Sequence, residues 1–290
     1  MKFHRLGGAF RVNLRLMGRG TGRVLVVGAL VSLVGGAAYA QRFFREGSLP
    51  PRFAPRQMPD SSFVICRLSY TRVRFEESGI GWQTDYPYAE INLTTRYSEL
   101  TKTRVSRDTD GTPNYYVVRT TDDALFNCPV VFISDAGTLG IEGREIDRLR
   151  QYLTKGGFIW ADDFWGEAAW EHWSEQIQQV LPPPDYIIED VPLNDPMLHS
   201  MIPMVKIPQI TNILFWRQNG GTITSEREDS EEVHMRVIRD AKRRVMVVMT
   251  HNTDVADSWE REGEDPGFFL QFSPQGYALG INVLLHIMTH

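Results

Sequence analysis

Three consecutive segments in the middle of the sequence constrain the fold of this chain most. Residues 129–134 and 158–161 are apolar runs, and an amphipathic segment at about 142–154 lies between them. The apolar positions of that segment recur at helical spacing, and Gly156 then provides a left-handed stop. Both apolar runs are too hydrophobic for a strand with one face in water. The pattern therefore predicts two parallel, buried strands joined by a helix.

Other segments repeat this alternation of strand and helix. Strands are expected at 63–68, 115–119 and 186–188, and helices at about 91–101, 166–180 and 275–288. Residues 233–238 and 245–250 flank a short turn, which predicts a β-hairpin at one side of the sheet. The alternation as a whole predicts an open α/β layered sheet over residues 62–290, with helices on both faces.

The first 40 residues predict an export signal. They start with six basic residues and no acid, continue with an apolar or small run at 24–37, and end in the small-x-small sequence Ala38-Tyr39-Ala40. The alternative is an uncleaved anchor that contacts the membrane through residues 24–40, although the apolar run is short for a membrane span. Residues 41–61, rich in Pro and Arg, predict a linker. We expect an exported protein that is periplasmic, secreted or anchored in the inner membrane.

The first predicted strand and its continuation contain two features of interest. Residues 67–74 alternate basic and apolar side chains, which predicts that this end of the element is half exposed. Cys66 lies in the strand, and Cys128, the other cysteine of the chain, lies beside the strand at 129–134. An oxidising compartment permits a disulfide between them. Two neighbouring buried thiols fit the same pattern, so the sequence is compatible with either a disulfide or two free thiols.

Nucleic-acid and phosphate-loop functions have no support in the sequence. The net charge is −5, and no basic patch is interleaved with aromatic residues. The glycines near residues 79–81 and 137–140 have neither the phosphate-loop sequence nor the dinucleotide spacing. We expect no nucleic acid among the partners and no cofactor.

Aspartates stand at the ends of the predicted central strands. Asp135 follows the strand at 129–134, and Asp162 and Asp163 follow the strand at 158–161. Ligands of open α/β sheets collect outside the carboxyl ends of the strands, so we expect these residues and Asp85 to share one edge. Converging carboxylates can raise a pKa to give a general acid, or bind a hard cation through oxygen. The structural alternative is capping, with Asp163 as the cap of the helix that starts after Trp165.

His251 and the tryptophans are weaker candidates for the same edge. His251 and Asp254 follow the strand at 245–250 and could form an acid–base pair or half of a metal site, but their spacing is not diagnostic. We expect His251 to be a surface loop residue. Trp82 and Trp165 lie near the predicted edge and are the candidates for an exposed sugar or partner surface.

A set of ordered motifs resembles the bacterial domain of unknown function 4159 family. The motifs are Asp85-Tyr86-Pro87, Thr101, Leu125-Phe126-x-x-Pro129, Leu149-Arg150-x-Tyr152-Leu153, Gly156-Gly157-Phe158, Asp162-Asp163, Asp195-Pro196-x-Leu198 and Gly280-x-Asn282. The resemblance extends from about Phe63 to the C-terminus. It implies a flavodoxin-like layered fold similar to the class I glutamine amidotransferases. It also implies envelope partners, since members often occur near genes for MoxR-type ATPases and von Willebrand A-domain proteins.

The amidotransferase mechanism is not expected even if the fold is similar. Those enzymes place a cysteine at a strand-to-helix turn, whereas the candidate turns here read Ile133-Ser-Asp-Ala-Gly137 and Ala161-Asp-Asp-Phe-Trp165. We therefore favour an exported, non-catalytic binding or assembly protein of the cell envelope that uses Asp85, Tyr86, Asp135, Asp162, Trp165 and Asp254. The alternatives are a carboxylate- or metal-dependent hydrolase using Asp162, Asp163 and His251, and a carbohydrate-binding module.

Overall fold

The computed structural model describes residues 50–77 and 79–290. The predicted export signal at 1–40, with its membrane contact at 24–40, lies outside the described residues, as does the first part of the predicted linker. Within the described part of the chain, no helix is both long and apolar enough for a bilayer span.

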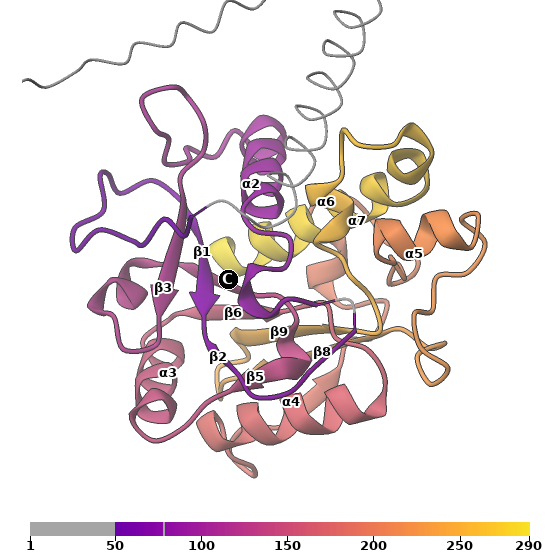
Figure 1. Cartoon of the computed structure of the whole chain (residues 1–290). Coiled ribbons are helices and arrows are strands. Elements are labelled where there is room, and N and C mark those ends of the chain that lie inside the picture. Colours follow the sequence, from indigo (N-terminus) through magenta and orange to yellow (C-terminus); the bar gives the residue numbers. More distant parts are fainter. Residues whose placement is uncertain (1–49, 78) are drawn as a thin grey trace, which may run out of the picture. The chain divides into compact units, whose positions relative to one another are not determined.

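Seven strands form one mixed sheet in the order β3-β1-β4-β6-β9-β8-β7 (Figure 1). They are β1 (Ile65–Ser69), β3 (Tyr115–Arg119), β4 (Val130–Ile133), β6 (Phe158–Ala161), β7 (Ile188–Asp190), β8 (His234–Arg239) and β9 (Val245–His251). The strands β3, β1, β4, β6 and β9 are mutually parallel, and β8 is antiparallel to both of its neighbours. Numbered along the chain, the five parallel strands are therefore arranged 2-1-3-4-5.

The predicted central unit is confirmed. Strands β4 and β6 pair in parallel with Ile133 opposite Ala161, and helix α3 (Arg144–Thr154) connects them. The hairpin of β8 and β9 is also confirmed at one side of the sheet, where β7 adds the outermost strand. A separate two-stranded ribbon joins β2 (Thr71–Arg72) to β5 (Leu139–Gly140).

Alternate side chains of the central strands enter two cores, one on each face of the sheet. Phe132 and Trp160 pack with helices α2 (Tyr88–Thr101) and α7 (Pro266–Thr289), near the short helices α5 (Ile213–Gln218) and α6 (Asp257–Glu260). Val131 and Ile159 pack with α3 and α4 (Glu167–Val180) on the opposite face. Figure 1 shows these two helix layers. The predicted arrangement, an α/β sheet with helices on both faces, is confirmed at this level.

The C-terminal helix begins much earlier than its periodicity indicated. The prediction started it at about residue 275, but α7 starts at Pro266. The Asp265 side chain accepts hydrogen bonds from the backbone N–H groups of Gly267 and Phe268, and Pro266 occupies the first helical position. The sequence contains this helix-start signal, Asp265-Pro266, but the prediction relied on the spacing of apolar residues alone and therefore began the helix too late.

A disulfide joins Cys66 in β1 to Cys128, which directly precedes Pro129 and the paired strand β4. The sequence left open whether these cysteines were bonded, and the structure shows that they are. Both residues are buried, at 0% and 2% exposure. The bond closes a loop over 62 positions of the chain and ties two of the central strands together.

Replacing both cysteines with alanine should lower the free energy of unfolding by about 4 kcal/mol, because the unfolded chain then regains the entropy of an open loop of this length. Urea unfolding of the two proteins measures the difference. Alkylation of the denatured, unreduced protein supplies the control: the mass should not change, and two adducts should appear only after reduction. Two adducts without reduction would contradict the bond.

Candidate functional site

The carboxyl edge of the parallel sheet has an unusual backbone. Asp135, Asp163 and Asn252 follow β4, β6 and β9, and Asp85 precedes α2; all four have positive φ, at 50°, 56°, 61° and 64° respectively. Non-glycine residues rarely adopt this left-handed region, and such strain clusters at functional sites. Four turns at one edge therefore share a costly conformation that other contacts must hold in place.

Asp85 is positioned by a buried arginine. Arg67, in the middle of β1, is 0% exposed; its Nε donates to Glu90 Oε1 at 2.5 Å, and its Nη1 donates to the Thr84 carbonyl at 2.7 Å. These bonds hold the chain on both sides of Asp85, and Ser134 Oγ donates to Asp85 Oδ2 at 2.6 Å. The prediction that residues 67–74 form a half-exposed alternation is wrong for Arg67, because its partner Glu90 lies on a helix that packs over the strand.

Three aspartates from separate connections meet at this edge. Asp85, Asp163 and Asp254 each offer a carboxylate oxygen, and the three oxygens lie within 4.8 Å of one another. Trp165 Nε1 donates to Asp163 Oδ1 at 3.0 Å, and the backbone N–H of Asp257 donates to Asp254 Oδ1 at 2.9 Å. Asp254 Oδ2 is buried and has no hydrogen-bond partner among the residues that the structure describes. We call Asp85, Asp163 and Asp254 the acid trio.

Burial makes ionisation of the edge carboxylates unfavourable. It raises the pKa of Asp85 to about 6 and the pKa of Asp135 and of Asp162 to about 7. Burial also raises the pKa of Asp163 and of Asp254 well above the usual range, and the charge of Asp85 adds to both effects. Full ionisation of these carboxyl groups would therefore place more negative charge at the edge than its surroundings can stabilise.

Asp135 and Asp162 lie at the same edge but have other partners. Asp162 accepts from Thr250 Oγ1 at 2.5 Å and from the backbone N–H of Ala256 at 2.9 Å, so it links β6 to β9 and to the start of α6. Asp135 Oδ2 accepts from the backbone N–H of Gly81 at 2.7 Å, and Arg72 Nη2 lies 4.0 Å from it. Both side chains organise the backbone around the acid trio.

The expectation that Asp163 caps the following helix is wrong. Helix α4 begins with no side-chain cap from within its own turn. Instead, Asp229 Oδ2 accepts from the backbone N–H of Glu167 at 3.0 Å. The cap therefore comes from the acidic segment at 228–232, which is distant in sequence, and Asp163 is free to point inward.

His251 is not a surface loop residue, and this expectation is also wrong. It is the last residue of β9, is 1% exposed, and stacks on Phe164 and Trp170 with ring centroids 5.0 and 5.5 Å away. Its Nε2 donates to the Gly166 carbonyl at 3.1 Å, and burial lowers the pKa of His251 to about 4. Among the described residues no hydrogen bond joins His251 to Asp254, because the ring faces the α4 layer.

The aromatic candidates are less exposed than expected. Trp165 is buried at 4% exposure, so its role as an exposed contact is wrong, and Trp82 is half-buried. Tyr86 is also buried, and its hydroxyl accepts from the backbone N–H of Arg52 at 3.0 Å. The rings of these three residues pack against the protein at this edge, which removes much of their apolar surface from water.

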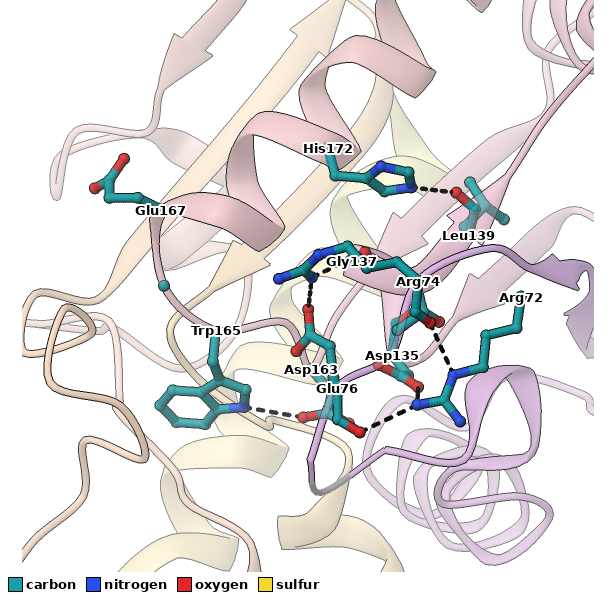
Figure 2. Close-up of polar contacts among 12 residues, drawn as sticks. Arg72, Arg74, Glu76, Asp135, Gly137, Leu139, Asp163, Trp165, Glu167 and His172 are labelled. Atoms are coloured by element: carbon teal, nitrogen blue, oxygen red, sulfur yellow. Dashed lines mark hydrogen bonds and ion pairs between the residues drawn. The ribbon is translucent and has the colours of Figure 1, made fainter.

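A surface hollow of about 390 Å³ lies over Trp165. It is lined by Arg74, Phe75, Glu76, Glu77, Trp165, Ala168, Arg227 and Asp229. Figure 2 shows the Trp165 indole turned toward the carboxylate of Asp163, and Arg74 reaching Glu76 and the Gly137 carbonyl. Trp165 thus stands between the hollow and the acid trio. No sequence pattern predicts this hollow, because its walls come from segments near residues 75, 165 and 228, which are far apart in the chain.

The family comparison agrees with the sequence motifs. The family model described as Domain of unknown function (DUF4159) matches residues 65–288. The chain belongs to this family. A search of curated proteins gave no match.

The metal-free protein should lose stability as the pH rises from 6.5 to 8. The folded-state pKa of Asp135 and of Asp162 is raised to about 7, above the unfolded value, so the stability present at low pH is lost as these groups ionise. His251 opposes this fall only weakly, because the unfolded histidine, with a pKa of about 6.5, is already half neutral at the start of the range. Thermal melts in EDTA should show a fall of about 5 °C over this range. Asp162→Asn should flatten the curve, and an equally steep curve in that variant would contradict the assignment.

Replacing Arg67 with methionine should lower the free energy of unfolding by about 3–5 kcal/mol, because Glu90 would remain buried without its partner. The double variant Arg67→Met/Glu90→Leu should regain much of that loss. Arg243→Met breaks the exposed pair with Glu189 and should leave the free energy of unfolding almost unchanged, because solvent screens that pair. Urea unfolding of the four proteins checks this, and a double variant as unstable as the single one would refute the role of the buried pair.

Proposed function

We propose that this chain is an exported binding or assembly domain of the bacterial cell envelope, with a flavodoxin-like fold of the class I amidotransferase type. The order 2-1-3-4-5 of its parallel strands is that of doubly wound flavodoxin-like sheets. The basic, apolar and small-residue sequence at 1–40 supports export. The family resemblance supports envelope partners, and a MoxR-type ATPase with a von Willebrand A-domain protein is the proposed system.

The site chemistry favours binding over amidotransferase catalysis. Both cysteines are consumed in the disulfide, so neither offers a thiolate. The left-handed turn positions after β4 and β6 are occupied by Asp135 and Asp163. An Asp–His hydrolase has less support, because His251 faces Phe164 and Trp170. A sugar platform has less support as well, because Trp165 is buried.

The observation that carries the proposal is an exposed surface above the carboxyl edge. Phe75 is 74% exposed and lines the hollow over Trp165. A second hollow of about 280 Å³ adjoins it and shares Asp229. Its other lining residues are Glu167, Glu228, Glu231, Glu232, His234 and Asn252. An apolar side chain beside a strongly acidic rim is complementary to a basic segment of a partner that also carries an apolar anchor.

Pull-down from envelope extracts with the full chain as bait should recover a partner through this surface. Phe75→Ser and Glu231→Lys/Glu232→Lys should each reduce its recovery at least about tenfold. Binding should also weaken as salt rises, because the contact is charged. The recovered protein is identified by mass spectrometry, and its Kd is then measured with purified components.

Two matched variants control for general effects. Leu270→Ser removes another apolar side chain of similar exposure, 75%, and Glu171→Lys/Glu175→Lys makes the same charge change on α4. Neither should alter recovery of the partner. Equal losses in the test and control variants would count against this surface as the binding site.

A further inference from the structure

We propose that the acid trio binds one hard divalent cation of the Ca²⁺, Mg²⁺ or Mn²⁺ type. The three ligand oxygens come from three connections: the segment before α2, the turn after β6 and the loop after β9. Two oxygens bound to one Ca²⁺ ion at its usual distance lie at most about 5 Å apart, so a group within 4.8 Å suits such an ion. This proposal does not depend on partner binding.

The way each carboxylate is held supports the assignment. A buried carboxylate is ordinarily paired with an Arg or Lys. Here the hydrogen-bond donors to Asp85, Asp163 and Asp254 are a hydroxyl, an indole and a backbone N–H, all of them neutral. In the part of the chain that the structure describes, none of the three forms an ion pair. Neutral donors fix the direction of a ligand carboxylate and leave its charge for a metal.

Asp254 provides the independent observation. The residue is 1% exposed, and among residues 50–77 and 79–290 its Oδ2 has no hydrogen-bond partner, although the side chain contributes an oxygen to the trio. Leaving a buried acceptor unsatisfied is costly, and a bound cation would satisfy it. The carboxylate is also held against rotation, because its Oδ1 already accepts from the N–H of Asp257.

The neighbouring charges explain why the ion belongs at this trio. Asp85 is also within 4.8 Å of Asp257 and Glu260 in a second acidic group, but Arg261 lies 3.0 Å from Asp257 and 2.9 Å from Glu260. The guanidinium of Arg261 therefore already neutralises this second acidic group. Arg67 attracts Asp85 from β1, yet it is committed to Glu90 at 2.5 Å. In the described ranges 50–77 and 79–290, no Arg or Lys forms an ion pair with Asp163 or Asp254.

The test uses the full chain, treated with EDTA and kept in detergent if it stays with the membrane. Calcium, magnesium and manganese chlorides are titrated separately at pH 7.5 by calorimetry and by thermal melting. One ion per chain should bind saturably, and at a hundredfold excess over Kd the melting temperature should rise by about 5 °C. Comparison of the three chlorides identifies the preferred ion.

The variants distinguish a metal site from acids that merely share protons. Asp254→Asn should weaken binding at least about tenfold. In EDTA it should melt no lower than the wild type, since the amide replaces a buried carboxyl group whose ionisation is unfavourable. Asp163→Asn should give the same loss of binding, which keeps the test valid if the first variant fails to fold. Asp195→Asn, which removes a half-buried acid paired with Arg239 outside this edge, should keep its Kd within about threefold.

Two results would overturn the proposal. One is the absence of binding heat and of a melting shift with all three cations. The other is an unchanged response in correctly folded Asp254→Asn and Asp163→Asn, which would place any bound ion elsewhere.

Discussion

The buried pair of Arg67 and Glu90 is the interaction on which the edge of the sheet depends. A guanidinium inside β1 loses its hydration, and the structure compensates with the Glu90 carboxylate and the Thr84 carbonyl. Such a pair contributes little net stability compared with apolar packing, but it fixes geometry. It holds the chain around Asp85 against the strand, and Asp85 thereby reaches Ser134 and the turn after β4. Without this anchor, the first member of the acid trio would have no fixed place.

The same edge shows how a fold can concentrate charge that its local sequence does not reveal. Each of the trio is an ordinary polar residue at the end of an element. Parallel strands bring their carboxyl ends to one edge, and the packed helices then exclude water from it. The raised pKa values of Asp85, Asp163 and Asp254 are the result. Whatever neutralises these groups, whether proton or cation, thereby contributes to the free energy of the folded state.

Regular elements were predictable because their signals are local. The central unit was predictable from the apolar runs at 129–134 and 158–161 and the helical period between them. The rule that ligands collect at the carboxyl ends of parallel strands then placed Asp135, Asp162 and Asp163 at one edge. Burial of single polar residues was not predictable, because it depends on distant partners. Arg67 was expected to be half exposed, but its partner Glu90 comes from a helix that packs over the strand. His251 was expected at the surface, but Trp170 of α4 covers its ring. The cap of α4 comes from Asp229, 62 positions away, a contact that no local pattern contains.

Trp165 contacts both the acid trio and the surface hollow at the carboxyl edge. Its indole N–H donates a hydrogen bond to Asp163 (Figure 2). The residue also lines the hollow to which Phe75 contributes. Any change of charge at the trio alters the strength of that hydrogen bond, since an ionised carboxylate is the better acceptor. A partner seated in the hollow packs against a wall that contains this residue. The acid trio and the hollow over the carboxyl edge therefore share one side chain, that of Trp165.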